Sequence, residues 1–158
     1  MAHLGRGLEL ASRLPASADR DRVELDLREA LGTAQMAHKG WPAAEVRAAL
    51  EPALVLCRAL GETDRLLSVL WGLWFNAAVG ADYARAFQVV GEMATDEAAG
   101  PSGLGVMRRC AAAMTCHWTG RFVEARGYAE EVLGLYDAAK HASLVRLTNH
   151  DPQCVVLV

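Results

Sequence analysis

Residues 46–60 read VRAALEPALVLCRAL, and their apolar side chains repeat with the period of an α-helix. The repeating positions are Val46, Ala49, Leu50, Ala53, Leu54, Cys57 and Leu60. This i, i+3, i+4, i+7 spacing is typical of an amphipathic helix with one buried stripe. The same pattern occupies residues 23–34 and 122–136, and strand patterns are almost absent. The sequence therefore predicts an all-α protein.

Turn-forming residues separate the helical segments. Gly40-Trp41-Pro42, Gly61, Gly80, Gly100-Pro101-Ser102 and Gly120 fall between apolar stripes, where glycine ends helices and proline begins them. The predicted helices cover residues 3–14, 18–38, 43–60, 63–79, 82–97, 102–119 and 121–139. Because the connections are short, neighbouring helices are expected to be antiparallel.

The predicted helices also repeat as pairs. Ala49, Ala86 and Ala125 occupy matching places and are 37 and 39 residues apart, the period of a helical solenoid. Chance spacing in an alanine-rich chain is the alternative. The repeat predicts a short right-handed solenoid at residues 1–142, with about three hairpins after a leading helix, and an incomplete further repeat at 143–158. Its uncapped apolar ends are expected to fray or to associate with another copy of the chain.

Residues 119–125, TGRFVEA, resemble the turn of the tetratricopeptide repeat: glycine, any residue, an aromatic, two residues and alanine. The turn at Gly80 departs from that pattern, because one extra residue separates Gly80 from Tyr83. The resemblance implies stacked helical hairpins in which the first helix of each pair lines a concave side.

A second resemblance covers nearly all of the chain. LELA at residues 8–11 before Leu14-Pro15, Leu31-Gly32 with Lys39-Gly40-Trp41, LWGLW at 70–74 and Asp151-Pro152 are similar to the helical-repeat region of bacterial multi-domain signalling ATPases. Those proteins often carry adenylate or guanylate cyclase domains or helix-turn-helix regulators. The resemblance implies a regulatory, protein-contacting segment whose catalytic modules lie outside it.

Composition excludes several classes of function. The net charge is −3 and no basic stripe is present, so nucleic-acid binding is not expected. The least charged stretch, residues 66–81, is shorter than the roughly 20 residues that cross a bilayer, so we expect a buried helix and no membrane segment. The four cysteines form no CxxC pair, and the first thirty residues lack a signal-peptide pattern. These features indicate the reducing cytoplasm.

Catalytic, cofactor and metal sites are not expected. Gly100 and Gly105 have the spacing of a phosphate loop, but Val106-Met107 stand where that loop needs Lys and Ser or Thr. Cys110 and His117 are two helical turns apart, about 10 Å along the axis, which is too far to share a metal. Cys116 points about 100° away from His117. Packing is favoured for all three, and a small enzyme that uses them is the alternative.

The best candidate for function is a surface. In the tetratricopeptide register the concave positions hold Trp71, Phe75, Met107, Cys110, Met114 and His117. These side chains either pack between helices or contact a partner, since aromatic residues and methionine are common at protein interfaces. The Lys/Asn/Arg set that clamps a carboxylate in some family members is missing, so the expected ligand is an apolar or helical protein segment, including other domains of a larger parent protein. The sequence predicts an interaction scaffold, with a purely structural spacer as a further alternative.

Overall fold

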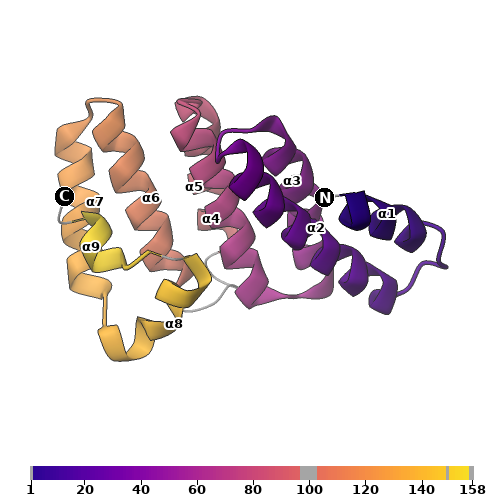
Figure 1. Ribbon diagram of the computed structural model, residues 1–158. Coiled ribbons are helices and arrows are strands. Elements are labelled where there is room, and N and C mark those ends of the chain that lie inside the picture. The colour runs from indigo at the N-terminus through magenta and orange to yellow at the C-terminus, as the bar shows by residue number, and fades with distance from the viewer. Residues whose placement is uncertain (1, 97–102, 149, 157–158) are drawn as a thin grey trace.

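The computed structural model describes residues 2–96, 103–148 and 150–156, which form nine helices and no strand. The helices are α1 (Ala2–Ala11), α2 (Ala18–Lys39), α3 (Ala44–Leu60), α4 (Thr63–Val79), α5 (Tyr83–Asp96), α6 (Leu104–Trp118), α7 (Phe122–Leu135), α8 (Ala138–Thr148) and α9 (Pro152–Val156). Each of α1 to α6 packs against the next helix, while α8 and α9, in yellow, lie back beside earlier helices (Figure 1). The prediction of an all-α protein is confirmed.

Most predicted helix boundaries agree with the observed ones to within two residues, but the predicted end of the helix over residues 121–139 is wrong. It ends at Leu135, and α8 begins at Ala138. The cause is Asp137, whose Oδ1 accepts hydrogen bonds from the backbone N–H of Ala139 at 2.9 Å and of Lys140 at 3.3 Å. A side chain that satisfies two free N–H groups starts a new helix. The predicted break at 100–102 lies outside the described residues.

Two glycines allow α2, α3 and α4 to approach closely around Leu50. A Cβ atom added to Gly32 on α2 would lie 2.9 Å from Leu50 Cδ2, and one added to Gly72 on α4 would lie 2.9 Å from Leu50 Cδ1. Leu50 itself is buried, with 4% of its surface exposed. The Leu50 side chain of α3 therefore fills space that a larger residue at Gly32 or Gly72 would occupy.

The three alanines at the predicted repeat positions are all buried. Ala49, Ala86 and Ala125 have exposed fractions of 2%, 0% and 8%. They lie on α3, α5 and α7, the second helices of the consecutive pairs α2–α3, α4–α5 and α6–α7. The predicted spacing therefore identified positions that are equivalent in burial.

Three of the turns share one backbone geometry. Gly61, Ala81 and Gly120 have φ values of 69°, 57° and 76°, in the left-handed region. In each turn the next residue donates its N–H to the carbonyl oxygen five residues earlier, at 3.0, 2.9 and 2.8 Å. This is the Schellman ending of a helix. Ala81, and not Gly80, is thus the counterpart of Gly120, which explains the extra residue before Tyr83.

The core is centred on α4. Leu67, Leu70 and Trp74 are fully buried there, and the helix buries residues on most of its sides, as expected for residues 66–81. The buried amide of Asn76 donates hydrogen bonds to the carbonyl oxygens of Trp41 and Ala43, the second at 3.0 Å, and so ties α4 to the connection between α2 and α3. None of the described helices is long and apolar enough to cross a membrane.

The C-terminal helices pack on earlier parts of the chain. Helix α8 contacts α4, and α9 contacts both α6 and α7. The expected division between residues 142 and 143 falls inside α8, so it does not mark the end of a helical unit. Val155 and Val156 are partly buried against the core of their own chain, whereas residues 157 and 158 of the stretch expected to fray or associate lie outside the described residues.

Candidate interaction surface

The six residues predicted to line a concave surface lie on two helices in contact, α4 and α6, but they differ in exposure. Trp71, Met107 and Cys110 are buried, with exposed fractions of 2%, 0% and 0%. Phe75 and Met114 are half-buried, and His117 is exposed. The first three therefore belong to the core of the chain as it stands, and the other three reach its surface.

Aromatic side chains join α4 to α6. The indole rings of Trp74 and Trp118 are stacked, with centroids 6.1 Å apart and planes 10° apart. Trp74 Nε1 donates a hydrogen bond of 2.9 Å to Thr115 Oγ1, which in turn donates to the carbonyl oxygen of Ala111 at 2.7 Å. Because these polar atoms are satisfied inside the protein, the cluster links the two helices without leaving a buried polar group unpaired in this chain of bonds.

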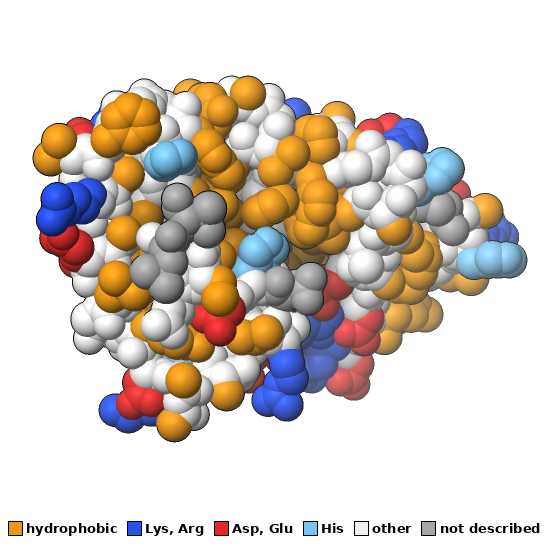
Figure 2. Space-filling view, turned by 60° about the vertical axis from the view of Figure 1, so that its left-hand side comes forward, with side chains coloured by type: hydrophobic (Ala, Val, Ile, Leu, Met, Phe, Trp, Pro, Cys, Tyr) orange, Lys and Arg blue, Asp and Glu red, His pale blue; other side chains and the backbone are white. Residues whose placement is uncertain are grey.

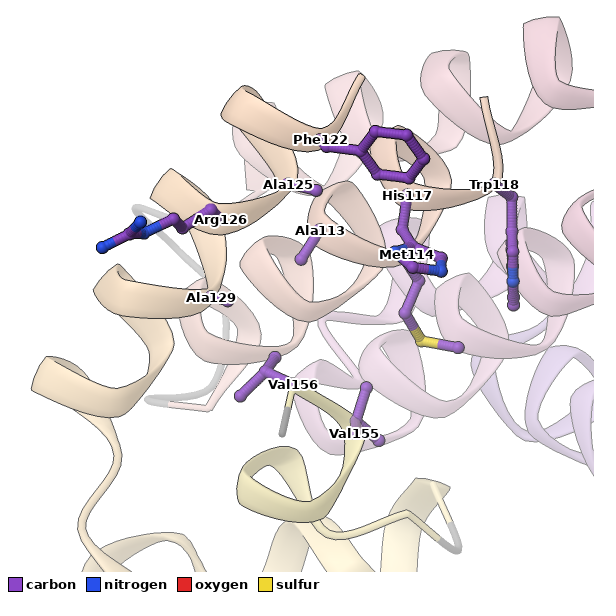
Figure 3. Close-up of a pocket in the computed structure, with 10 residues that line it drawn as sticks. All are labelled: Ala113, Met114, His117, Trp118, Phe122, Ala125, Arg126, Ala129, Val155 and Val156. Carbon is purple, nitrogen blue, oxygen red and sulfur yellow. The ribbon is translucent and has the colours of Figure 1, made fainter. Parts of the chain in front are cut away.

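A groove with a volume of about 600 Å³ lies between α6 and α7. We call it the α6–α7 groove, and its lining residues are Ala113, Met114, His117, Trp118, Phe122, Ala125, Arg126, Ala129, Val155 and Val156. Figure 3 shows the alanines between the two helices and the guanidinium group of Arg126 pointing away from the other labelled side chains. Arg126 pairs with Glu130 at 2.7 Å, so its charge is directed to the outer surface of α7. The groove is therefore mainly apolar.

The rim of the groove exposes large apolar side chains. Phe122 and Trp118 have exposed fractions of 62% and 40%, and the ring of His117 lies against that of Phe122 with centroids 5.5 Å apart. Hydrophobic side chains also gather on the face at this end of the molecule in the space-filling view (Figure 2). Exposed aromatic groups around an apolar hollow are typical of protein contact sites.

One end of the groove is occupied by the chain itself. Val155 and Val156 reach from α9 toward α6 and α7 (Figure 3). The short helix α9 thus places two apolar side chains in the same hollow that the aromatic rim surrounds.

Two of the six predicted surface residues, Met114 and His117, line this groove. The prediction missed Phe122 and Ala129 because it considered first helices alone, which leaves out α7, and it missed Trp118 at the last residue of α6. A signal was present: Trp118 and Phe122 are large aromatic residues on either side of the turn at Gly120.

The cysteine residues of α6 lie in surroundings unlike those of a reactive thiol. Burial raises the pKa of Cys110 to about 12, and the Cys110 Sγ donates a weak hydrogen bond to the carbonyl oxygen of Pro152 at 3.9 Å. Burial also raises the pKa of Cys116. Nucleophilic cysteines need the thiolate, which these shifts disfavour. Within the described ranges, no three His, Cys, Asp or Glu side chains form a group that could hold a metal ion.

Comparison with known proteins gives no match. No protein-family model, no curated protein and no solved structure matches this chain.

Proposed function

We propose that this chain is a helical-repeat interaction module that binds an apolar, helical segment of another protein in the α6–α7 groove. The observation that carries the proposal is the groove itself: an apolar hollow of about 600 Å³ with an exposed aromatic rim, at the end of a row of packed helix pairs.

The packing of the earlier helix pairs supports a helix as the ligand. Helix α4 packs on α3, and α6 packs on both α4 and α5. The pair α6–α7 carries Ala125 in the place that Ala49 and Ala86 hold in the earlier pairs, but among the described helices α7 has its main contacts with α6 and with the five-residue helix α9. A solenoid buries such surfaces by stacking one more helix on each pair. A helix from a partner has the shape to cover the part of the α6–α7 pair that the short helix α9 leaves exposed.

The chemistry of the groove favours an apolar face on that helix. Its lining consists of alanine, valine, methionine and aromatic side chains, with His117 as the polar group near the rim. Since Arg126 is paired with Glu130, no unpaired cation among the described lining residues is directed at an acidic ligand. Helix-in-groove recognition uses apolar anchors at i, i+3, i+4 and i+7.

A regulatory setting in the cytoplasm is part of the proposal. It is supported by the resemblance to the repeat regions of signalling ATPases and by the four free cysteines Cys57, Cys110, Cys116 and Cys154, which suit a reducing compartment. In that setting the module would bring a partner, or another domain of its parent protein, to the catalytic modules.

A displayed library of helical peptides tests the proposal. Selection on the full chain should enrich peptides with apolar residues at helical spacing. Ala129→Glu, which places a carboxylate in the groove, should weaken their binding by about tenfold or more. The matched control is Val123→Glu on the same helix, because Val123 is 85% exposed and does not line the groove. The proposal fails if no helical peptide is enriched, or if both variants weaken binding equally.

A further inference from the structure

The chain covers part of its own predicted binding surface. Residues 138–156, which we call the C-terminal segment, lie on α4 and α6 through α8 and α9. Ser68 Oγ of α4 donates a hydrogen bond of 3.1 Å to the carbonyl oxygen of Leu147, and Cys110 Sγ of α6 donates to that of Pro152. The Ser68 and Cys110 side chains thus bind backbone oxygens of the segment, so these two hydrogen bonds do not depend on which side chains the segment carries.

His150 covers the two aromatic residues of α4 that the sequence indicates for partner contact. Its ring centroid is 5.4 Å from that of Trp71 and 5.3 Å from that of Phe75. The burial of Trp71 in the core therefore depends in part on a side chain of the C-terminal segment. Without that segment, α4 would present an aromatic surface beside the α6–α7 groove.

Leu144 anchors the segment at a second point. It is 2% exposed, and a Cβ atom added to Gly103 at the start of α6 would lie only 2.2 Å from Leu144 Cδ2. Leu144 thus fills a hollow that exists because residue 103 has no side chain. The segment thus contacts the rest of the chain through three kinds of side chain: Leu144 in this hollow, the His150 ring on Trp71 and Phe75, and two valines, Val155 and Val156, at the groove.

The attachment of the segment is slight for its length. Helix α8 has 11 residues and buries three of them, and α9 has 5 and buries one. Helices this short are marginal alone, so the order of the segment depends on its docking to the rest of the chain. The docked state also leaves the buried Trp71 Nε1 without an acceptor among the described residues. A buried donor without an acceptor destabilises the docked state.

We infer that the C-terminal segment is an internal ligand, and that the face of α4 and α6 beneath it binds a segment of the same chemistry from another protein. That segment carries a leucine on a short helix, then a ring side chain, then an apolar helical turn. It binds by displacing residues 138–156. The inference rests on the proposed function and adds the partner class and the competition that controls access.

The test uses the full chain with its segment released. Leu144→Asp puts a carboxylate in the apolar hollow, and Leu147→Asp, at a partly buried position, is an independent second variant. The probe is a labelled synthetic peptide of residues 138–156 with serine in place of Cys154, and binding is followed by fluorescence anisotropy. Both released variants should bind it about tenfold more tightly than the unaltered chain, in which the resident segment competes.

Three further measurements locate the site. Adding Gly103→Ala to Leu144→Asp should abolish much of the gain, because the new methyl group fills the hollow that the peptide's leucine needs. A peptide with His150→Ala and Leu144→Asp should not bind. Resonances of the Trp71 indole should shift on binding of the unaltered peptide.

The inference is overturned if the released variants bind the peptide no better than the unaltered chain, or if Gly103→Ala has no effect. It is also overturned if both variants lose the helices α1 to α7 by circular dichroism, since the segment would then be a structural part of the core. These failures are distinguishable from failure of the proposed function, because the library peptides selected for the α6–α7 groove would still bind and still respond to Ala129→Glu.

Discussion

Replacing Gly72 with alanine tests the contact between three helices around Leu50. Alanine at this mid-helix position would carry its Cβ 2.9 Å from Leu50 Cδ1, closer than carbon atoms approach without displacement. Leu50 has little room to move toward α2, because its other methyl group already packs against Gly32, at 2.9 Å from where a Cβ of that residue would lie. The substitution therefore sets an intrinsic gain in helix propensity against a forced shift of a buried leucine.

The two effects have comparable magnitudes, and overpacking is expected to win. Glycine to alanine inside a helix is worth about 1 kcal/mol. Overpacking a core typically costs about 1–3 kcal/mol. We expect Gly72→Ala to lower the free energy of unfolding by about 0–2 kcal/mol. In a Leu50→Ala background the clashing methyl groups are absent, so the same change should raise that free energy by about 1 kcal/mol.

Urea denaturation followed by helical circular dichroism measures both values. Gly127→Ala is the matched control, because this glycine also lies inside a helix and no described neighbour comes within 4 Å of an added Cβ. It should stabilise the protein in either background. If Gly72→Ala stabilises the otherwise unaltered chain as much as Gly127→Ala does, or if its cost persists without Leu50, the close approach of the three helices is wrong.

Three more outcomes follow from single residues. Ala81→Gly should stabilise by about 0.5–1 kcal/mol in thermal unfolding, because it relieves a left-handed alanine; no gain would refute the strain. Asn76→Ala should cost about 1–3 kcal/mol, since the carbonyl oxygen of Trp41 loses its donor while that of Ala43 keeps the bond from the Val46 N–H; a cost below that of the exposed control Gln153→Ala would exclude this. The folded-state pKa of Cys110, about 12, exceeds the ordinary value of 9.0, so its contribution to stability is complete below pH 9 and declines above it; Cys110→Ala should make the fall in unfolding free energy from pH 8 to pH 10 shallower.

The helices were predictable because local signals agree with the tertiary packing. Residues 18–38 and 63–79 were expected as helices, and α2 and α4 cover nearly the same ranges. The Ser17 side chain accepts a hydrogen bond from the Arg20 N–H, and Gly61 ends α3 in a left-handed conformation, so these ends are determined by neighbouring residues. Where capping is local, the sequence alone is sufficient.

The break between α7 and α8 was missed for a related reason. Tyr136-Asp137 contains neither glycine nor proline, and the apolar pattern continues through it. Only the capping ability of Asp137 marks the change, and an aspartate in an otherwise helical stretch is equally compatible with a solvated helix face. The left-handed Ala81 was hidden in the same way, because Gly80 next to it is the residue that usually adopts that conformation.

The position of the C-terminal segment could not be predicted from spacing at all. The hydrogen bond between Ser68 and Leu147 joins residues 79 positions apart, and no periodic pattern connects them. Leu144 fits its hollow only because residue 103 is glycine, a complementarity that neither stretch reveals alone. For this reason the prediction placed Trp71 and Phe75 on a concave interaction surface, with no means of knowing that His150 lies against both rings.

The stacked indoles of Trp74 and Trp118 also give the protein an intrinsic optical probe. Two parallel chromophores with centroids 6.1 Å apart couple electronically, and the resulting near-ultraviolet dichroism changes sharply with their mutual angle. One ring belongs to α4, while the other ends α6 at the rim of the groove, with 40% of its surface exposed. An occupant of the groove that moves the Trp118 ring relative to that of Trp74 would alter that signal without a label, so that its entry can be timed by stopped-flow dichroism.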